Sequence, residues 1–90
     1  MKAPEAAARR ARRAALRALI AEARPGVDGA LGDQDPLITS GLVESSTLVA
    51  IATWVEEQVG GELPLADFDL VTDWDSVDAI LAFVERHAHA

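Results

Sequence analysis

The stretch SGLVESSTL, residues 40–48, decides the fold, because an irregular segment ends and a regular helix begins within it. Upstream, residues 25–44 are punctuated by glycine and proline, which interrupt helices. Downstream, residues 45–59 carry apolar side chains at helical spacing: Leu48, Ile51, Ala52, Val55 and Val59. Gly60 predicts a left-handed C-terminal cap. Ser45 therefore falls in the first helical turn, beside unpaired N–H groups and the positive end of the helix dipole.

Two further segments predict long helices. In residues 5–24 the apolar positions follow helical spacing, and Pro25-Gly26 ends the helix. In residues 76–88 the spacing recurs, and either Asp75 or Ser76 is placed to cap the helix. Residues 66–74 predict a short third element after the extended segment 63–65. Together these segments predict an all-α fold. We expect one domain, 1–90, with three main helices plus one short helix in a small four-helix bundle with a long first loop, 25–44.

Composition narrows the class of protein. Half of the ninety residues are hydrophobic, which suffices for one small core. A chain of this length leaves no room for a cleft between two domains. The absence of cysteine excludes disulfides and thiolate metal sites. No apolar run reaches the length of a signal peptide core or a membrane span, so we expect a soluble, cytoplasmic protein without a membrane span.

Charge divides the chain unevenly. Residues 1–24 hold seven basic side chains against two acidic ones, whereas residues 25–90 hold thirteen acidic side chains against one basic one. The acidic part should repel nucleic acid, so we expect no nucleic-acid partner. The arginines of the first helix admit two interpretations. In the first, the helix is an arm that binds nucleic acid or a membrane surface. In the second, the arginine side chains are solvated or face the acidic part of the chain. We favour the second, because no aromatic residues interleave the arginines for stacking on bases.

The acidic residues near the C-terminal end raise the question of a metal site. Their spacing fails the calcium-binding loop pattern, so we interpret Asp67, Asp69, Asp73, Asp75 and Asp78 as turn formers, caps and solubilising charge. His87 and His89 lie at the chain end, and we expect them to be surface residues without a metal.

The second helix has a second, sparsely charged face. Thr47, Ala50 and Trp54 share it, and it is either a partner surface or, at Trp54, the edge of the core. At the start of the helix, Ser45 or Ser46 could also serve as a plain N-cap.

Gly41-Leu42-Val43-Glu44-Ser45 resembles the Gly-Leu-Leu-Asp-Ser-Leu motif of acyl and peptidyl carrier proteins. Two further features are similar to this family. One is the Leu63-Pro64 segment after a glycine, and the other is the stretch 74–80, WDSVDAI, which is similar to the Phe-x-Ser-Val-Asp-Ala-Ile opening of the family's last helix. The likeness covers residues 31–84. It implies a carrier that partner enzymes act on, with no catalytic residues of its own.

The resemblance places a phosphopantetheine arm, donated by coenzyme A, on Ser45. It implies three kinds of partner: a phosphopantetheinyl transferase, an acyl- or aminoacyl-loading enzyme, and a downstream synthase, condensation or acyltransferase enzyme. The arm's terminal thiol would hold a thioester although the chain lacks cysteine. Candidates for contact with the arm or a partner are Leu42, Val43, Glu44, Ser46, Thr47, Leu48 and Trp54.

The chain departs from the family in three places. Glu44 replaces an aspartate, and Ser46 replaces an apolar residue that the modifying enzyme reads, which implies slower or more selective modification. The second helix is acidic only at Glu56 and Glu57, which is similar to free-standing carriers of specialised polyketide or non-ribosomal peptide pathways. The alternative is an unmodified carrier-like docking or scaffold module. Catalysis is disfavoured, because both histidines lie far in sequence from Ser45.

Overall fold

The structure is a computed structural model that describes residues 3–61, 63 and 69–87. Its elements are α1 (Ala3–Ala23), the short 3-10 helix η1 (Asp28–Ala30), α2 (Ser45–Val59), α3 (Leu70–Asp73) and α4 (Val77–His87). The predicted all-α class, with three main helices, one short helix and a long first loop, is confirmed. α2 begins and ends at the expected residues, while α1 and α4 differ from expectation by one or two residues at the ends that are described.

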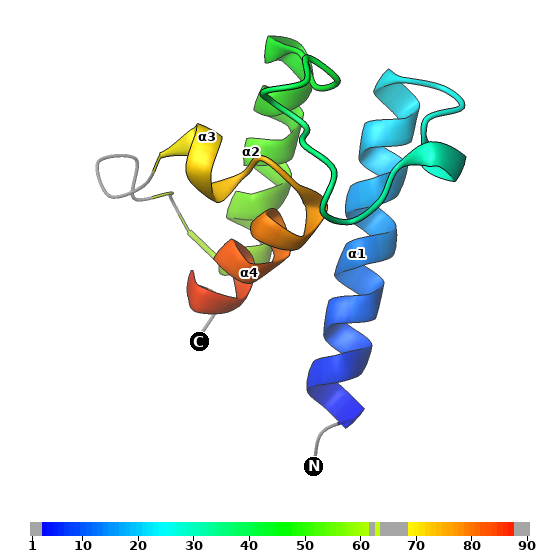
Figure 1. The fold of residues 1–90 in the computed structure, drawn as a ribbon. Helices are drawn as coiled ribbons and strands as arrows, with labels where there is room; N and C mark the ends of the chain where they lie inside the picture. The colour runs from blue at the N-terminus through cyan, green and yellow to red at the C-terminus, as the bar shows by residue number, and fades with distance from the viewer. Residues whose placement is uncertain (1–2, 62, 64–68, 88–90) are drawn as a thin grey trace.

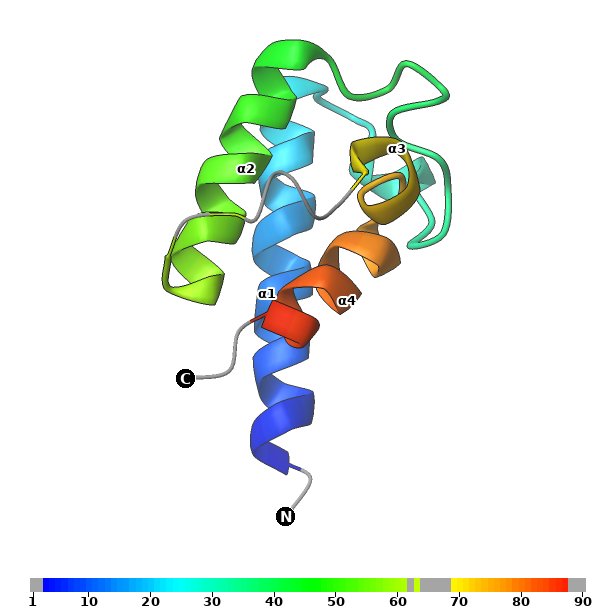
Figure 2. The ribbon, with the colours of Figure 1, turned by 90° about the vertical axis from the view of Figure 1, so that its left-hand side faces the viewer.

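The three main helices pack pairwise against one another. α1 and α2 lie side by side and run in opposite directions, and α4 crosses beside both (Figures 1 and 2). The loop between α1 and α2 passes close to the junction of α3 and α4 before it reaches the start of α2 (Figure 1). The N-terminal turns of α1 extend beyond the other helices (Figures 1 and 2).

Side chains from all three main helices and from the long loop form the core. The fully buried set comprises Leu16, Ile20, Leu37, Ile51, Val55, Trp74, Val77, Ile80, Leu81, Phe83 and Val84. The rings of Trp74 and Phe83 meet edge to face, with their centroids 5.6 Å apart and their planes at 86°. Leu31, Leu37 and Val43 bring the loop into the same cluster. The loop is therefore part of the core, and its apolar residues offset the entropy lost on ordering it.

Local signals fix the helix ends. Gly60 closes α2 with φ 81° and ψ 24°, and its N–H donates to the carbonyl of Glu56 at 2.9 Å. This left-handed geometry was predicted, because glycine adopts it without a Cβ clash. Ser76 caps α4 by accepting the N–H of Ala79 at 3.0 Å, and Asp69 caps α3 by accepting the N–H of Val71 at 3.0 Å.

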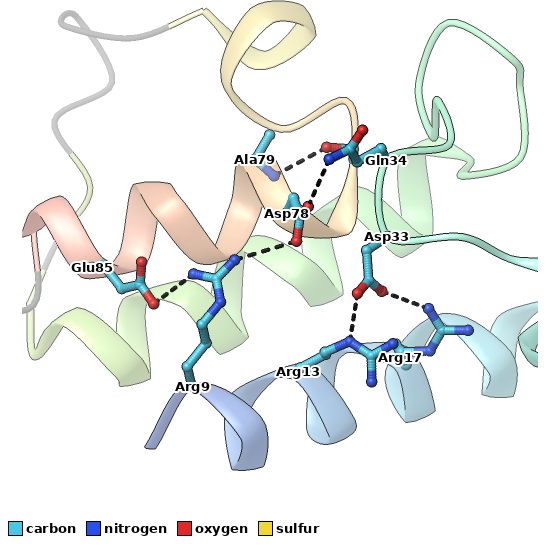
Figure 3. A network of polar contacts seen from close by, with 9 residues as sticks. Arg9, Arg13, Arg17, Asp33, Gln34, Asp78, Ala79 and Glu85 are labelled. Carbon is cyan, nitrogen blue, oxygen red and sulfur yellow. Dashed lines mark hydrogen bonds and ion pairs between the residues drawn. The ribbon is translucent and has the colours of Figure 1, made fainter. Parts of the chain in front are cut away.

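Arg9 joins the N-terminal half of α1 to α4. Its guanidinium lies 2.6 Å from a carboxylate oxygen of Glu85 and 3.2 Å from one of Asp78 (Figure 3). The hydrogen bond to Glu85 is the main cause that raises the pKa of Arg9. Gln34 from the loop also reaches the Asp78 carboxylate, at 3.4 Å.

Arg13 and Arg17 converge on one loop carboxylate. The Asp33 carboxylate accepts hydrogen bonds from the guanidinium of Arg13 at 2.6 Å and from that of Arg17 at 2.8 Å (Figure 3). Arg17 also donates to the carbonyl of Leu31 at 2.6 Å. The hydrogen bond from Arg13 is the largest cause that lowers the pKa of Asp33. These pairs confirm, for Arg9, Arg13 and Arg17, that the basic helix faces the acidic part of the chain.

Some predictions concern residues that the structure does not describe. They are the extended segment at 64–65, the first residues of the element expected at 66–74, including Asp67, and the surface position of His89. Within the described ranges, no helix is both long and apolar enough to span a membrane. The same residues contain no group of three or more His, Cys, Asp or Glu side chains placed to hold a metal.

Candidate functional site at the start of helix α2

Ser45 is the first residue of α2, and its side chain is exposed. Glu44 precedes it as the N-cap, with extended backbone (φ −92°, ψ 172°) and no side-chain capping bond. The carbonyl of Glu44 accepts the N–H of Leu48 at 2.9 Å, which starts the helical hydrogen-bond ladder. The interpretation of Ser45 or Ser46 as a plain N-cap is therefore wrong. Both serines lie inside the first turn.

The first turn of α2 leaves polar groups available. Among the described residues, neither the Ser45 hydroxyl nor the N–H groups of Ser45, Ser46 and Thr47 form a hydrogen bond. Such N–H groups carry the partial positive charge of the helix N-terminus. An anionic group attached to the Ser45 oxygen would therefore lie beside unused donors.

A tight turn positions the backbone just before this site. The N–H of Gly41 donates to the carbonyl of Ile38 at 3.0 Å, and Gly41 has φ 78°, a value that favours glycine. The Ser40 hydroxyl donates to the carbonyl of Pro36 at 2.6 Å and accepts the N–H of Leu42 at 3.2 Å. The segment 36–42 is thus closed on itself by local bonds.

Asp75, at the junction of α3 and α4, holds this turn from outside. One carboxylate oxygen accepts the N–H groups of Leu37 at 3.1 Å, Ile38 at 2.7 Å and Thr39 at 3.0 Å. The other oxygen accepts the Thr39 hydroxyl at 2.8 Å. These bonds, the one from the Thr39 N–H first, lower the pKa of Asp75 because they favour the charged form.

The interpretation of Asp75 as a helix cap is wrong, whereas its bonds to the turn 37–39 agree with the interpretation as a turn former. Ser76 alone caps α4, so the Asp75 side chain is available to the loop. The sequence gives a weak signal for this role of Asp75. Asp75 and Ser76 are both capping residues, and one helix needs only one of them. The sequence does not reveal the loop that receives the spare carboxylate, because that loop lies far away along the chain.

The predicted contact residues divide by exposure. Glu44 and Ser46 are exposed, whereas Leu42, Leu48 and Trp54 are half-buried and pack against the core. Val43 is only 6% exposed and Thr47 only 8%. Val43 and Thr47 therefore offer little surface to the arm or a partner, and their predicted contacts stay a prediction. Val49, which sequence reasoning missed, is 67% exposed on α2.

An open groove of about 290 Å³ lies beside the site, between the end of α1 and the start of α2. Its lining is mixed in polarity: Leu19, Glu22 and Ala23 from α1, and Ser46, Thr47 and Ala50 from α2. Ser46 thus borders the groove, while its neighbour Ser45 lies outside the lining. A group attached to Ser45 would therefore start one residue away from the groove lining.

Within the described part of the chain, Ser45 has no histidine base beside it. His87 is the last residue of α4, where its ring centroid lies 4.4 Å from that of Phe83. The end of α4 lies toward the C-terminal end of α2, away from the start of α2 (Figures 1 and 2). The arrangement at Ser45 therefore presents a hydroxyl without the His87 base.

Comparisons with family models, curated proteins and solved structures find no match to this chain. An assignment of function must therefore rest on the motif and the geometry of the chain itself.

Proposed function

We propose that the chain is a free-standing acyl or aminoacyl carrier protein whose phosphopantetheine arm is attached to Ser45. The observation that carries the proposal is the exposed, unengaged hydroxyl of Ser45 at the first residue of α2, within the Gly-Leu-Val-Glu-Ser motif. The carrier is not an enzyme. Its partners are a phosphopantetheinyl transferase, a loading enzyme and a downstream synthase, condensation or acyltransferase enzyme, all in the cytoplasm.

The attachment step needs only a reachable hydroxyl on this chain. The Ser45 oxygen forms a bond to the phosphorus that bears pantetheine, and the diphosphate P–O bond of coenzyme A breaks. The adenosine bisphosphate leaves, and the hydroxyl proton passes to the transferase. The fold serves this step by presenting Ser45 at an exposed helix end.

The residues around Ser45 fit a phosphodiester. The N–H groups of the first turn are not used by the Glu44 side chain, and the helix dipole favours an anion there. Glu44 carries a like charge, but it is exposed, so solvent and salt screen its repulsion. When bound, the arm supplies the thiol that holds an acyl or aminoacyl group as a thioester, chemistry that a chain without cysteine lacks.

The charge of α2 favours a specialised polyketide or non-ribosomal peptide pathway. From Ser45 to Val55 the helix has no charged residue, and Glu56 and Glu57 come only near its end. The exposed part therefore offers Val49 and Ala50 instead of an acidic surface. Partners with strongly basic docking surfaces would gain little from such a helix.

The test is intact-mass spectrometry after incubation with coenzyme A and a broad-specificity phosphopantetheinyl transferase. We expect one phosphopantetheine on the wild-type protein, one on Ser46→Ala and none on Ser45→Ala, because only Ser45 presents the attacking oxygen. Circular dichroism checks that all three proteins are folded. Modification of Ser45→Ala would show that the arm is elsewhere. A folded wild-type protein that several transferases leave unmodified would favour the unmodified docking module instead.

A further inference from the structure

Asp75 reaches the candidate site through Leu37. The N–H of Leu37 donates to the Asp75 side chain at 3.1 Å and to the Asp75 carbonyl at 2.7 Å. The carbonyl of Leu37 accepts the N–H of Val43 at 3.0 Å, two residues before Ser45. Leu37 is fully buried and Val43 is 6% exposed, so both ends of this connection are anchored in the core.

The bonds to Asp75 are of the strong kind. A carboxylate that accepts several N–H and O–H groups forms charge-assisted bonds, which are shorter and stronger than neutral ones. The bonds from Ile38 at 2.7 Å and from the Thr39 hydroxyl at 2.8 Å fit this description. Three consecutive N–H groups would lose their common acceptor if the carboxylate were removed, and the turn would gain conformational freedom.

We propose that Asp75 is a positioning residue for the modification of Ser45. Its carboxylate fixes the turn 37–39, and this turn fixes the backbone that delivers Ser45 to the modifying enzyme. The inference rests on the proposed carrier function. It adds that recognition by the transferase depends on a side chain outside the motif, on the connection between α3 and α4.

The experiment measures kcat and KM of transferase-catalysed modification for the wild type and three variants. Asp75→Ala removes all four side-chain bonds. Asp75→Asn keeps a carbonyl oxygen as an acceptor but removes the charge. Asp69→Asn is the matched control, because Asp69 also accepts a backbone N–H, at 3.0 Å, but only the one from Val71 in its own helix.

We expect kcat/KM to fall about tenfold or more for Asp75→Ala, because several charge-assisted bonds are lost. For Asp75→Asn we expect a smaller fall, about two- to fivefold, since its amide oxygen still accepts. Asp69→Asn should match the wild type. The loss should appear mainly in KM, because the transferase must order the released turn when it binds.

Amide hydrogen exchange separates positioning from general destabilisation. In Asp75→Ala the exchange of the amides of residues 37–39 should rise by a larger factor than that of Ile80, Leu81 and Val84 in α4, whose exchange follows only the global loss of stability. An equal rise in the turn and in α4 together with the rate loss would indicate a merely structural residue and overturn the proposal. Wild-type kcat/KM in a variant whose turn exchanges rapidly would also overturn it. Failure of the carrier function is distinguishable, because the wild-type protein itself would then remain unmodified.

Discussion

At the scale of single residues, the account depends on two side chains with opposite environments. Ser45 is exposed and its hydroxyl makes no hydrogen bond within the described part of the chain. Asp75 is partly buried and its carboxylate accepts four hydrogen bonds. The first side chain is available for chemistry, whereas the second is committed to holding a loop. The two are connected through Leu37 and Val43.

Asp75→Ala should lower stability in a pH-dependent way. Loss of its hydrogen bonds should cost about 2 kcal/mol at pH 7. Because folding lowers the pKa of Asp75, its contribution is present above the unfolded pKa of about 3.9 and is lost as the pH falls through the folded pKa. The wild type and the variant should therefore converge in stability as the pH falls below that unfolded pKa. Urea denaturation at a series of pH values measures both curves.

The control for this prediction is Asp35→Ala. Among the described residues, Asp35 accepts only the nearby N–H of Gly32, at 2.8 Å, and it is exposed. Its loss should change stability by less than about 0.5 kcal/mol at any pH. A gap between the wild type and Asp75→Ala that stays constant as the pH falls below the unfolded pKa would contradict the account of the Asp75 carboxylate.

Single residues also show what sequence could and could not predict. Ser45 was found because a break in the pattern and a motif coincide at it. Thr47 was assigned to the wrong face, because the apolar stripe was counted from Leu48, while the buried face runs through Thr47, Ile51 and Val55. Asp75 was not found, because its partners are distant in sequence and backbone N–H groups leave no mark in a sequence.

At the scale of elements, α2 is the best determined helix, because punctuation is strong at both of its ends. The turn with Gly41 stops just before it, and Gly60 closes it in left-handed geometry. The sequence predicts the long loop only as an irregular segment punctuated by glycine and proline. Its connection to Asp75 and the pairing of Asp33 with α1 depend on tertiary placement, which periodicity does not encode.

Gly60→Ala and Gly61→Ala should separate backbone geometry from crowding. A Cβ at either position would meet no atom within 4 Å, but only Gly60, with φ 81°, has a positive φ. Gly60→Ala should therefore cost about 1 kcal/mol, because alanine is strained in the left-handed region. Gly61→Ala should be nearly neutral. Urea denaturation followed by circular dichroism measures both, and equal losses would contradict the assignment of Gly60 as the cap.

At the scale of the whole molecule, the loop and the helices form one structure. Leu31, Leu37 and Val43 share the core with α1, α2 and α4, and Asp33 ties the loop to the arginines of α1. The charge asymmetry of the sequence thus becomes an internal pairing between the basic helix and the acidic remainder. Part-buried pairs of this kind, such as Arg17 with Asp33, are screened less by salt than exposed ones.

Leu37→Ala should destabilise the whole protein and not the loop alone. Leu37 is fully buried in the shared core, so its truncation should cost about 3 kcal/mol. Leu70→Ala is the control, because Leu70 is 41% exposed and should cost less than about 1 kcal/mol. Thermal unfolding should give a single transition in both variants. A Leu37→Ala protein with unchanged stability would show that the loop is not part of the cooperative core.

The central claim is that Ser45, and not its neighbour Ser46, carries the arm. The most direct measurement is fragment-ion mass spectrometry of the modified protein after cleavage at glutamate, since Glu44 and Glu56 flank both serines. The account predicts a peptide in which the phosphopantetheine mass lies on Ser45. A modified peptide with the added mass on Ser46, or a folded protein whose peptide carries no added mass, would contradict it.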